Sequence, residues 1–326
     1  MGSQRGLESS LVAREGYELK AIEVAALKGK GIGGKLISLL AIPRSLWQSR
    51  KLLRSVQPAL VLGVGGYTSG PVVLTAWAMG IRTVIHEQNS FPGLSNRILG
   101  RFVDRVFISF ENSGAHFPRR KTVLTGNPVR KKLQRVKEDS REPGEKEFTL
   151  FIFGGSQGAH RLNQAMEESL PHFGDLKGKI RIIHQTGDKD YDYVRAFYER
   201  EGVAAEVHRF IYDMERAYRA ADLILCRAGA TTLFELMAVG KAAVLVPYPY
   251  AANDHQTLNA KTLVDAGAAL MVANADLNGK VLSGLVRELK ENPERRKRMG
   301  ERAAALAQPG AAEKIADLCY RMVENE

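Results

Sequence analysis

The chain has 326 residues, of which 44% are hydrophobic, 25% charged and 7% aromatic. This composition is close to the globular average and excludes a disordered, collagenous or coiled-coil protein. Lysine and arginine outnumber aspartate and glutamate by 47 to 36, and the resulting charge of +11 favours an anionic partner: nucleic acid, anionic lipid or a phosphorylated substrate. The two cysteines, Cys226 and Cys319, are too far apart to indicate a disulfide framework or a zinc site.

Short apolar runs rich in β-formers alternate with longer helical patterns along the chain. This alternation predicts parallel sheets with helical crossovers, an α/β fold of doubly wound units. The predicted strands are 59–62, 82–85, 105–109, 122–125, 148–153, 180–183, 223–226 and 243–246. No apolar stretch approaches the ~20 residues that span a bilayer, and residues 1–15 lack the apolar centre of a signal peptide.

The domain boundary is predicted at the most polar interruption, residues 137–147, which contains Pro143 and Gly144 but no apolar anchor. The predicted domains are therefore 1–140 and 141–308. Beyond Asp276 the pattern is helical, with breaks at 292–293 and 309–310. The last piece, 309–326, is expected to be a helix that could pack across a cleft between the domains.

Two glycine clusters follow predicted strands and precede predicted helices: GVGGYTSGP at 63–71 and GGSQGA at 154–159. Glycine lets the backbone approach an anion closely there, and the free amides of the helix start neutralise phosphate charge. A tight turn is the alternative for either cluster alone. Two such loops, one in each half, favour a phosphate-bearing ligand in an interdomain crevice.

Two polar motifs follow strands in the first half. HEQN at 86–89 places four hydrogen-bonding side chains at a sheet end, and its His-Glu pair could supply a base and an orienting partner. A polar loop in which Asn89 caps a helix is an equal alternative. GNPVR at 126–130 ends in Arg130, which could reach a phosphate, although a turn followed by a surface arginine explains it as well.

Two further motifs follow strands in the second half. RAGATTLFE at 227–235 opens a helix with Gly229 and paired threonines, and Glu235 inside that helix could accept hydrogen bonds from ribose hydroxyls. An N-cap with a glutamate in the first turn is the alternative. NDHQTLNA at 253–260 would, alone, be a loop and a cap.

Together, GVGGYTSGP, HEQN, TGNPVR, GGSQGA, CRAGATTLFE and NDHQTLNA resemble the MurG family of bacterial glycosyltransferases in order and spacing over nearly the whole chain. The resemblance implies a GT-B fold of two Rossmann-like domains that face a cleft, with the acceptor in 1–140 and UDP-N-acetylglucosamine in 141–308. It implies inverting transfer of N-acetylglucosamine to undecaprenyl-diphospho-N-acetylmuramoyl-pentapeptide on the cytoplasmic membrane face, in peptidoglycan synthesis, with no cofactor and no metal.

The resemblance also implies roles for individual residues. Ser156 would contact the diphosphate, Arg130 the nucleotide side of the cleft, and the backbone of Ile211 the uracil. Glu235 would hold the ribose, while Gln256 and Asn89 would hold the sugar. The remaining implied substrate-binding residues are Ala230, Thr231, Thr232, Leu233 and Phe234, the first three serving the phosphates. The implied acceptor-phosphate loop comprises Gly65, Gly66, Tyr67, Thr68 and Ser69, and His86 is the candidate catalytic base.

One family feature has no counterpart here. Members begin with a strand and a glycine-rich G-G-T-G-G-H loop, whereas residues 1–8 resemble a point after the family's second strand. The resemblance therefore implies a first domain that is incomplete at its amino terminus by about one βαβ opening of ~30 residues.

A membrane-facing stripe is expected between Lys28 and Lys51, where aliphatic residues and a tryptophan are ringed by cations. Such a pattern suits shallow insertion into an anionic leaflet, and a core helix with a basic face is the alternative. The apolar members are Leu36, Leu39, Leu40, Ile42, Leu46 and Trp47.

Three rival functions stay open. One is another UDP-sugar enzyme of GT-B fold, an epimerase or a glycolipid synthase, against which HEQN and GNPVR argue. Another is an inactive fragment that still binds nucleotide. A basic nucleic-acid-binding protein is the third, but the chain has no reading motif and no aromatics interleaved with a basic stripe, so no nucleic-acid partner is expected.

Overall fold

A computed structural model of the chain describes residues 2, 12, 16–22, 32–135 and 147–324. Its contacts divide the chain into two compact units, one formed by Met1–Gly126 with Ala312–Glu326 and the other by Asn127–Ala311. The division precedes the predicted boundary at 140, because Leu133 is buried and its short 3₁₀ turn contacts α8 (Ala230–Val239) of the second unit. Polar composition marks where a chain is exposed, whereas a unit ends where its contacts change.

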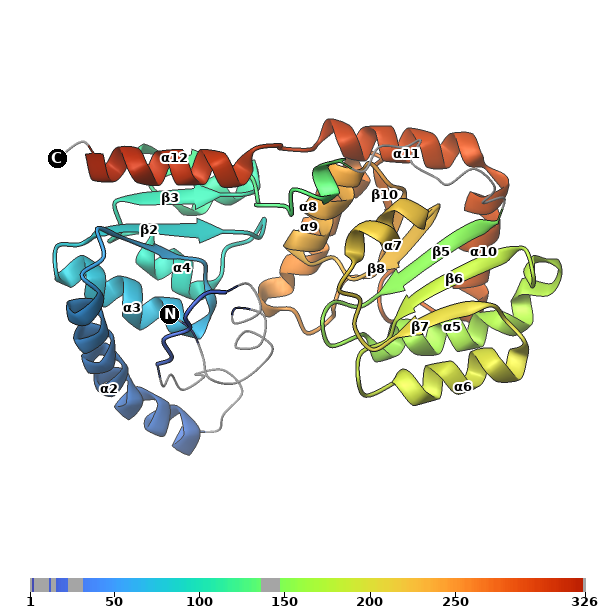
Figure 1. The fold of residues 1–326 in the computed structure, drawn as a ribbon, viewed down its shortest axis with the longest axis horizontal. Coiled ribbons are helices and arrows are strands. Elements are labelled where there is room, and N and C mark those ends of the chain that lie inside the picture. The colour runs from blue at the N-terminus through green and yellow to red at the C-terminus, as the bar shows by residue number, and fades with distance from the viewer. Residues whose placement is uncertain (1, 3–11, 13–15, 23–31, 136–146, 325–326) are drawn as a thin grey trace. The chain divides into compact units, whose positions relative to one another are not determined.

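The first unit is a parallel sheet with helices on its faces (Figure 1). Its helices and strands are α2 (Ile32–Val56), β1 (Leu60–Gly63), α3 (Gly66–Ala78), β2 (Arg82–Glu87), α4 (Leu94–Leu99), β3 (Arg105–Ile108), β4 (Thr122–Leu124) and α12 (Ala311–Glu324). Among the described residues the strand order is β1-β2-β3-β4. The apolar residues of β2 and β3 are buried, as expected where a sheet is covered on both faces, whereas those of β1 and β4 are half-buried or exposed.

The carboxyl-terminal helix α12 belongs to the first unit. Ile315 packs with Val84 of β2 and Phe107 of β3, and the Lys314 ammonium donates to the carbonyl of Leu124 at 2.8 Å. Figure 1 shows this helix lying along the sheet beside β3. The chain therefore returns to its first unit after completing the second.

The second unit is a six-stranded parallel sheet with order β10-β9-β8-β5-β6-β7. Its elements are β5 (Phe148–Phe153), α5 (His160–Phe173), β6 (Ile180–Gln185), α6 (Tyr191–Glu201), β7 (Ala205–His208), α7 (Met214–Ala220), β8 (Leu223–Cys226), α8, β9 (Ala243–Leu245), α9 (His255–Asp265), β10 (Ala269–Met271), α10 (Gly279–Glu291) and α11 (Pro293–Ala305). β5 and β8 are neighbours in the middle of the sheet; β6 and β7 follow on the side of β5, and β9 and β10 follow on the side of β8. This topological switch point is where open α/β sheets bind ligands, outside the carboxyl ends of the strands.

The structure confirms the eight predicted strands and the helical breaks near 292 and 309. The sequence prediction missed β7 and β10. Both are short, and neither carries the long apolar run that identified the other strands, because both lie toward the outer edges of the sheet where burial is incomplete.

Within the described residues, no helix combines the length and the hydrophobicity needed to cross a membrane. The stripe expected at 28–51 lies on α2. Trp47 is 63% exposed, and the Lys51 ammonium lies 5.8 Å from its ring centroid. Lys28 and Lys30 lie outside the described residues, as do the side chains of Leu36, Leu39, Leu40 and Ile42.

Candidate active site

The glycine loop after β5 and the opening of α8 lie next to each other at the switch point of the second sheet. Phe153 at the end of β5 is in register with Cys226 at the end of β8, so the two following segments leave the sheet at the same level. The sequence placed both motifs after strands. Their proximity follows from the strand order, which brings β5 and β8 together although β6 and β7 lie between them in the chain.

The loop at 154–158 is a tight turn with Ser156 exposed at its tip. The N–H of Gly158 donates to the carbonyl of Gly155 at 3.0 Å, and both glycines have positive φ, +75° and +88°. A Cβ on Gly158 would lie 1.8 Å from the carbonyl oxygen of Thr186, so only glycine fits there. This backbone therefore needs its glycines, and it presents Ser156 toward solvent at the sheet end.

The first turn of α8 has free backbone donors. Gly229 at the N-cap is extended and supplies no side-chain cap, and Leu233 is the first residue whose N–H bonds to the carbonyl of Gly229. Thr231 is exposed and Thr232 half-buried, while Leu233 and Phe234 are buried and anchor the helix. Uncapped donors at a positive helix end suit a phosphate.

Glu235 is a buried carboxylate inside α8, with 6% of its surface exposed. Its Oε2 accepts a hydrogen bond from the Tyr218 hydroxyl at 2.9 Å. Burial raises the pKa of Glu235, while the Tyr218 hydrogen bond and the nearby charge of Arg130 act in the opposite direction. Arg130 belongs to the second unit, and the 3₁₀ turn that follows it, Leu133–Arg135, contacts α8, the helix that carries Glu235.

The loops after β7 and β9 complete the carboxyl edge of this sheet. Ile211 is buried, and its backbone N–H donates to the side-chain oxygen of Gln185 at 2.7 Å. Gln256 is half-buried in the first turn of α9, where its Oε1 accepts from the N–H of Tyr248 at 2.9 Å. Its amide NH₂ group remains the donating end of the side chain.

Arg227 fixes the segment that follows β9. Its Nη1 donates to the carbonyls of Val246 and Pro247, both at 3.1 Å, and burial lowers the pKa of the guanidinium to about 10. This arginine therefore organises the loop that leads to Gln256. In the sequence Arg227 is only the first residue of RAGATTLFE, and no local pattern predicts this role.

In the first unit, His86 is 3% exposed, and both ring nitrogens have partners. Nε2 lies 3.0 Å from the carbonyl oxygen of Gly126, and Nδ1 lies 3.2 Å from Nε2 of Gln88. Burial lowers the pKa of His86, which favours the neutral ring. The carbonyl of Gly126 can only accept, so this contact suits the tautomer with hydrogen on Nε2. To accept a proton, Nδ1 would first have to lose Gln88, so its role as a base stays a prediction.

The other members of HEQN hold the surrounding loops. Glu87 does not orient His86: its Oε1 accepts from the N–H and the side-chain amide of Asn89, and its Oε2 accepts from Gly93 and Asn96. Gln88 donates to the carbonyl of Val64 at 3.1 Å. The motif is thus a hydrogen-bonded brace between the end of β2 and the glycine loop after β1.

The predicted acceptor-phosphate loop opens α3. Gly65 is the N-cap residue with φ +88°, and no side chain caps this helix start. Ser69 donates its hydroxyl to the carbonyl of Gly65, while Gly66 is exposed and Thr68 half-buried. The side chain of Tyr67 lies outside the described residues. Like the start of α8, this helix start has backbone N–H groups without a side-chain cap, and such groups suit an anion.

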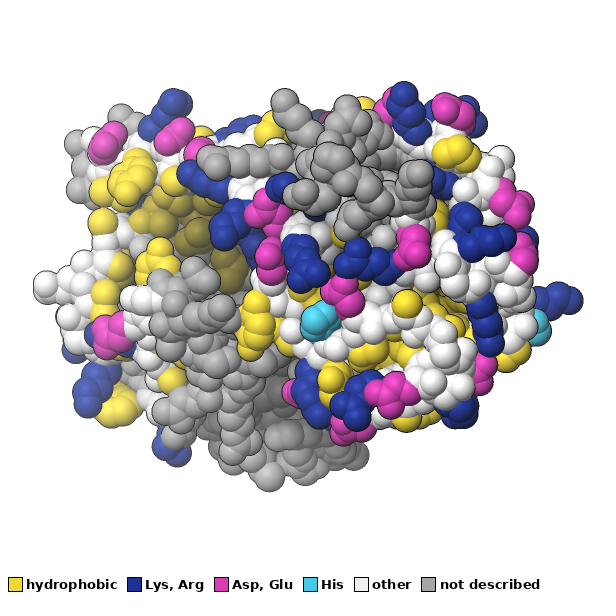
Figure 2. All heavy atoms as spheres, turned by 45° about the vertical axis from the view of Figure 1, so that its right-hand side comes forward, with side chains coloured by type: hydrophobic (Ala, Val, Ile, Leu, Met, Phe, Trp, Pro, Cys, Tyr) yellow, Lys and Arg dark blue, Asp and Glu magenta, His cyan; other side chains and the backbone are white. Residues whose placement is uncertain are grey.

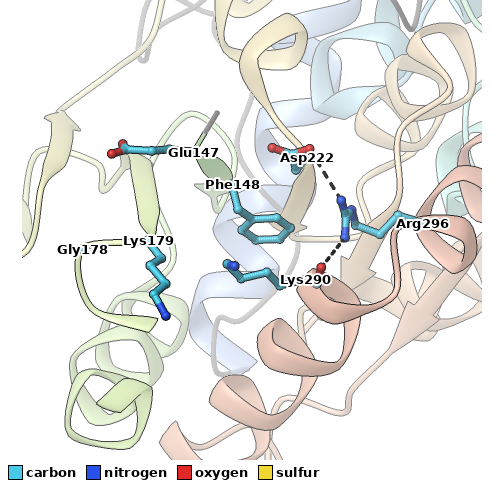
Figure 3. Close-up of a pocket in the computed structure, with 7 residues that line it drawn as sticks. All are labelled: Glu147, Phe148, Gly178, Lys179, Asp222, Lys290 and Arg296. Carbon is cyan, nitrogen blue, oxygen red and sulfur yellow. Dashed lines mark hydrogen bonds and ion pairs between the residues drawn. The ribbon is translucent and has the colours of Figure 1, made fainter. Parts of the chain in front are cut away.

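A surface pocket of about 390 Å³ lies at the opposite, amino edge of the second sheet (Figure 3). Arg296 lies 5.0 Å from the centroid of the Phe148 ring, pairs with Asp222 at 3.9 Å and donates to the carbonyl of Lys290 at 3.0 Å. Asp222 in turn accepts from the N–H of Thr149 at 2.9 Å. These contacts join α10 and α11 to the sheet, so the pocket is part of a structural joint.

Two buried residues at the site, Gln185 and Tyr218, were not identified from the sequence. Each lies in an ordinary strand or helix pattern, and its importance comes from a partner distant in the chain. In the described part of the chain, no group of three His, Cys, Asp or Glu side chains could hold a metal ion.

Comparison with known proteins identifies the family. Residues 1–108 match the glycosyltransferase family 28 N-terminal domain, and residues 149–315 match its C-terminal domain. The UDP-N-acetylglucosamine--N-acetylmuramyl-(pentapeptide) pyrophosphoryl-undecaprenol N-acetylglucosamine transferase of Anaeromyxobacter dehalogenans is 49% identical over 100% of this chain and 85% of its own length.

Solved structures agree with this relationship. The crystal structure of Acinetobacter baumannii MurG superposes with a TM-score of 0.75 at 33% identity, covering 98% of this chain and 89% of that one. The UDP-GlcNAc 2-epimerase of Neisseria meningitidis, at 13% identity, a TM-score of 0.64 and coverage of 97% and 89%, shares only the fold. The chain has the α/β architecture of GT-B glycosyltransferases and belongs to glycosyltransferase family 28, within its MurG family.

Proposed function

We propose that the protein transfers N-acetylglucosamine from UDP-N-acetylglucosamine to undecaprenyl-diphospho-N-acetylmuramoyl-pentapeptide in peptidoglycan synthesis. The observation that carries this assignment is the group of nucleotide-suited elements at the switch point of the second sheet: the Ser156 turn, the uncapped start of α8 and buried Glu235. Relatives that are nearly half identical over the whole chain bear the name of this reaction.

The proposed donor site uses each element for one part of the nucleotide sugar. Ser156 and the amides of Ala230, Thr231 and Thr232 receive the diphosphate, and Arg130 adds positive charge on the same side. Glu235 accepts the ribose hydroxyls, Ile211 meets the uracil, and the amide of Gln256 donates to the sugar. These donors stabilise negative charge on the departing UDP, which is the charge that grows in the transition state.

The first unit is proposed to present the acceptor. The amides of 65–69 at the start of α3 suit the acceptor's diphosphate, and Asn89 is proposed to contact the sugar. The acceptor hydroxyl attacks the anomeric carbon from the side opposite UDP, which inverts the configuration. His86 is the proposed base: being neutral, it has a lone pair on Nδ1 that becomes available when Gln88 turns away.

We place the enzyme at the cytoplasmic face of the cell membrane as a peripheral protein, because its acceptor has a polyprenyl chain. Trp47 is exposed on α2, with cationic Arg44, Arg50 and Lys51 on the same helix. The edge-to-face pair of Trp77 and Phe102, 5.0 Å between ring centroids, adds exposed apolar surface to this unit. Aromatic and cationic side chains together suit an anionic leaflet.

The positive charge of the second unit is largely compensated at its surface. In Figure 2, lysine and arginine side chains lie among acidic ones over this unit. Arg161 pairs with Glu168, Arg200 with Glu167, and Arg181 with Glu206. Because cations held in ion pairs do not form a continuous strip for a phosphate backbone, we propose lipid rather than nucleic acid as the macromolecular anion.

The deciding experiment measures transfer of radiolabelled sugar from UDP-N-acetylglucosamine to a polyprenyl-diphosphate-linked muramoyl-pentapeptide. Product should form with this acceptor and be inhibited by UDP. Two matched reactions test the other UDP-sugar activities. One contains a glycolipid acceptor, and the other contains no acceptor and is analysed for epimerised sugar. Epimerised product without transfer would overturn the proposed reaction.

Binding to lipid vesicles tests the proposed membrane contact. Trp47→Ser should reduce the part of vesicle binding that resists salt, whereas Lys51→Glu should reduce only the salt-sensitive part.

A further inference from the structure

One buried side chain joins two loops at the carboxyl edge of the second sheet. Gln185 is the last residue of β6, in register with Phe153 of β5 and His208 of β7, and it is 3% exposed. Its Nε2 donates to the carbonyl of Gly155 at 2.9 Å, and its Oε1 accepts from the N–H of Ile211 at 2.7 Å. A single carboxamide therefore links the turn of Ser156 to the segment of Ile211.

At the Gly155 end, Gln185 holds the base of a tight turn. The carbonyl of Gly155 accepts from both Gln185 and the N–H of Gly158, and the backbone of Gly158 rests directly against Thr186. Two donors on one carbonyl fix the direction of that peptide plane. The exposed Ser156 that follows is therefore oriented by a residue from the neighbouring strand.

At the Ile211 end, Gln185 decides which backbone group can meet a base. The N–H of Ile211 is donated to Gln185, so its carbonyl oxygen is the group of that residue left to recognise a ring. A carbonyl accepts from the N3–H of uracil, whereas N3 of cytosine carries no hydrogen and would face it as a second acceptor. Leaving polar groups unpaired in this way is a strong source of discrimination.

We propose that Gln185 is a positioning residue for the donor nucleotide, which sets the spacing of the base and diphosphate subsites and makes the site select uracil through the carbonyl of Ile211. This assignment rests on the proposed function, in which Ser156 meets the diphosphate and Ile211 the base. Gln185 itself need not touch the substrate. Its effect is exerted through the two backbone groups that it holds.

Two substitutions separate the two hydrogen bonds. Gln185→Met removes both while keeping a side chain of similar length, and it frees the N–H of Ile211 to donate to N3 of cytosine. Gln185→Glu keeps an acceptor for Ile211 but loses the amide donor to Gly155. Ser169→Ala is the matched control, because Ser169 is a buried residue of the same unit whose hydroxyl bonds to Met166 within α5.

The measurement is calorimetric affinity for UDP and for CDP, with circular dichroism to establish folding. Gln185→Met should bind UDP about tenfold more weakly, because the two backbone groups that Gln185 holds would then have to be ordered when the nucleotide binds. Its preference for UDP over CDP should shrink at least severalfold. Gln185→Glu should weaken both nucleotides alike and keep the preference, while Ser169→Ala should change neither value.

The outcomes distinguish this assignment from the proposed function. A parent protein that binds neither nucleotide overturns both. If the parent prefers UDP, and folded Gln185→Met has the same affinities and the same preference, only the role of Gln185 is overturned. If Gln185→Met does not fold, Gln185→Glu decides: unchanged UDP affinity in that variant overturns the link to Gly155.

Discussion

Glu235 offers the sharpest test of the donor site, because its partner and its burial are both known. In Glu235→Gln the side-chain oxygen can still accept from the Tyr218 hydroxyl, so packing is kept while the negative charge is lost. Hydrogen bonds to charged groups contribute about 1.5–3 kcal/mol. If the ribose hydroxyls donate to this carboxylate, UDP should therefore bind about 10- to 100-fold more weakly.

The assay is titration calorimetry with two ligands, UDP and its 2′,3′-dideoxy analogue, which lacks both ribose hydroxyls. The substitution should weaken UDP and leave the analogue unchanged. Because burial raises the pKa of Glu235 and binding favours the ionised form, UDP affinity of the parent should rise with pH through that pKa. Glu235→Gln should lack this dependence. Equal losses for both ligands, or none for UDP, would refute the ribose assignment.

Two further predictions concern stability. Asp222→Asn should lower the free energy of unfolding by about 1–3 kcal/mol, because Arg296 loses its carboxylate partner. UDP affinity should stay unchanged, because the donor site is proposed at the opposite edge of the sheet. Weaker UDP binding at unchanged stability would contradict the structural role of Asp222. Burial lowers the pKa of His184 from 6.5 to about 3, while its ring bonds to Tyr198 and Asn163. The unfolded state therefore binds more protons between these values, and stability should fall as pH drops below about 6.5, by up to about 1.4 kcal/mol per pH unit. Urea titrations of the parent and His184→Gln measure this slope, which should be smaller in the variant; equal slopes would assign it to other groups.

The fold class and most of the strands could be predicted from the amino-acid sequence alone. Buried parallel strands such as β5 consist almost entirely of apolar residues, and this requirement is visible in a linear run of residues. The glycines of 154–158 were equally readable, because a turn with positive φ accepts few other residues. The family followed from the order and spacing of such local motifs.

Which of these motifs lie next to each other, and which partner each polar side chain bonds, became visible only in the folded chain. Strand order places β8 beside β5, and no local pattern encodes that choice, because it depends on packing between segments about 70 residues apart. Likewise the position of His86 in the sequence does not reveal that both of its ring nitrogens have hydrogen-bonding partners. Gln185 carried no signal, since a buried glutamine in a strand acquires its role only from the two backbone groups that the fold brings within its reach.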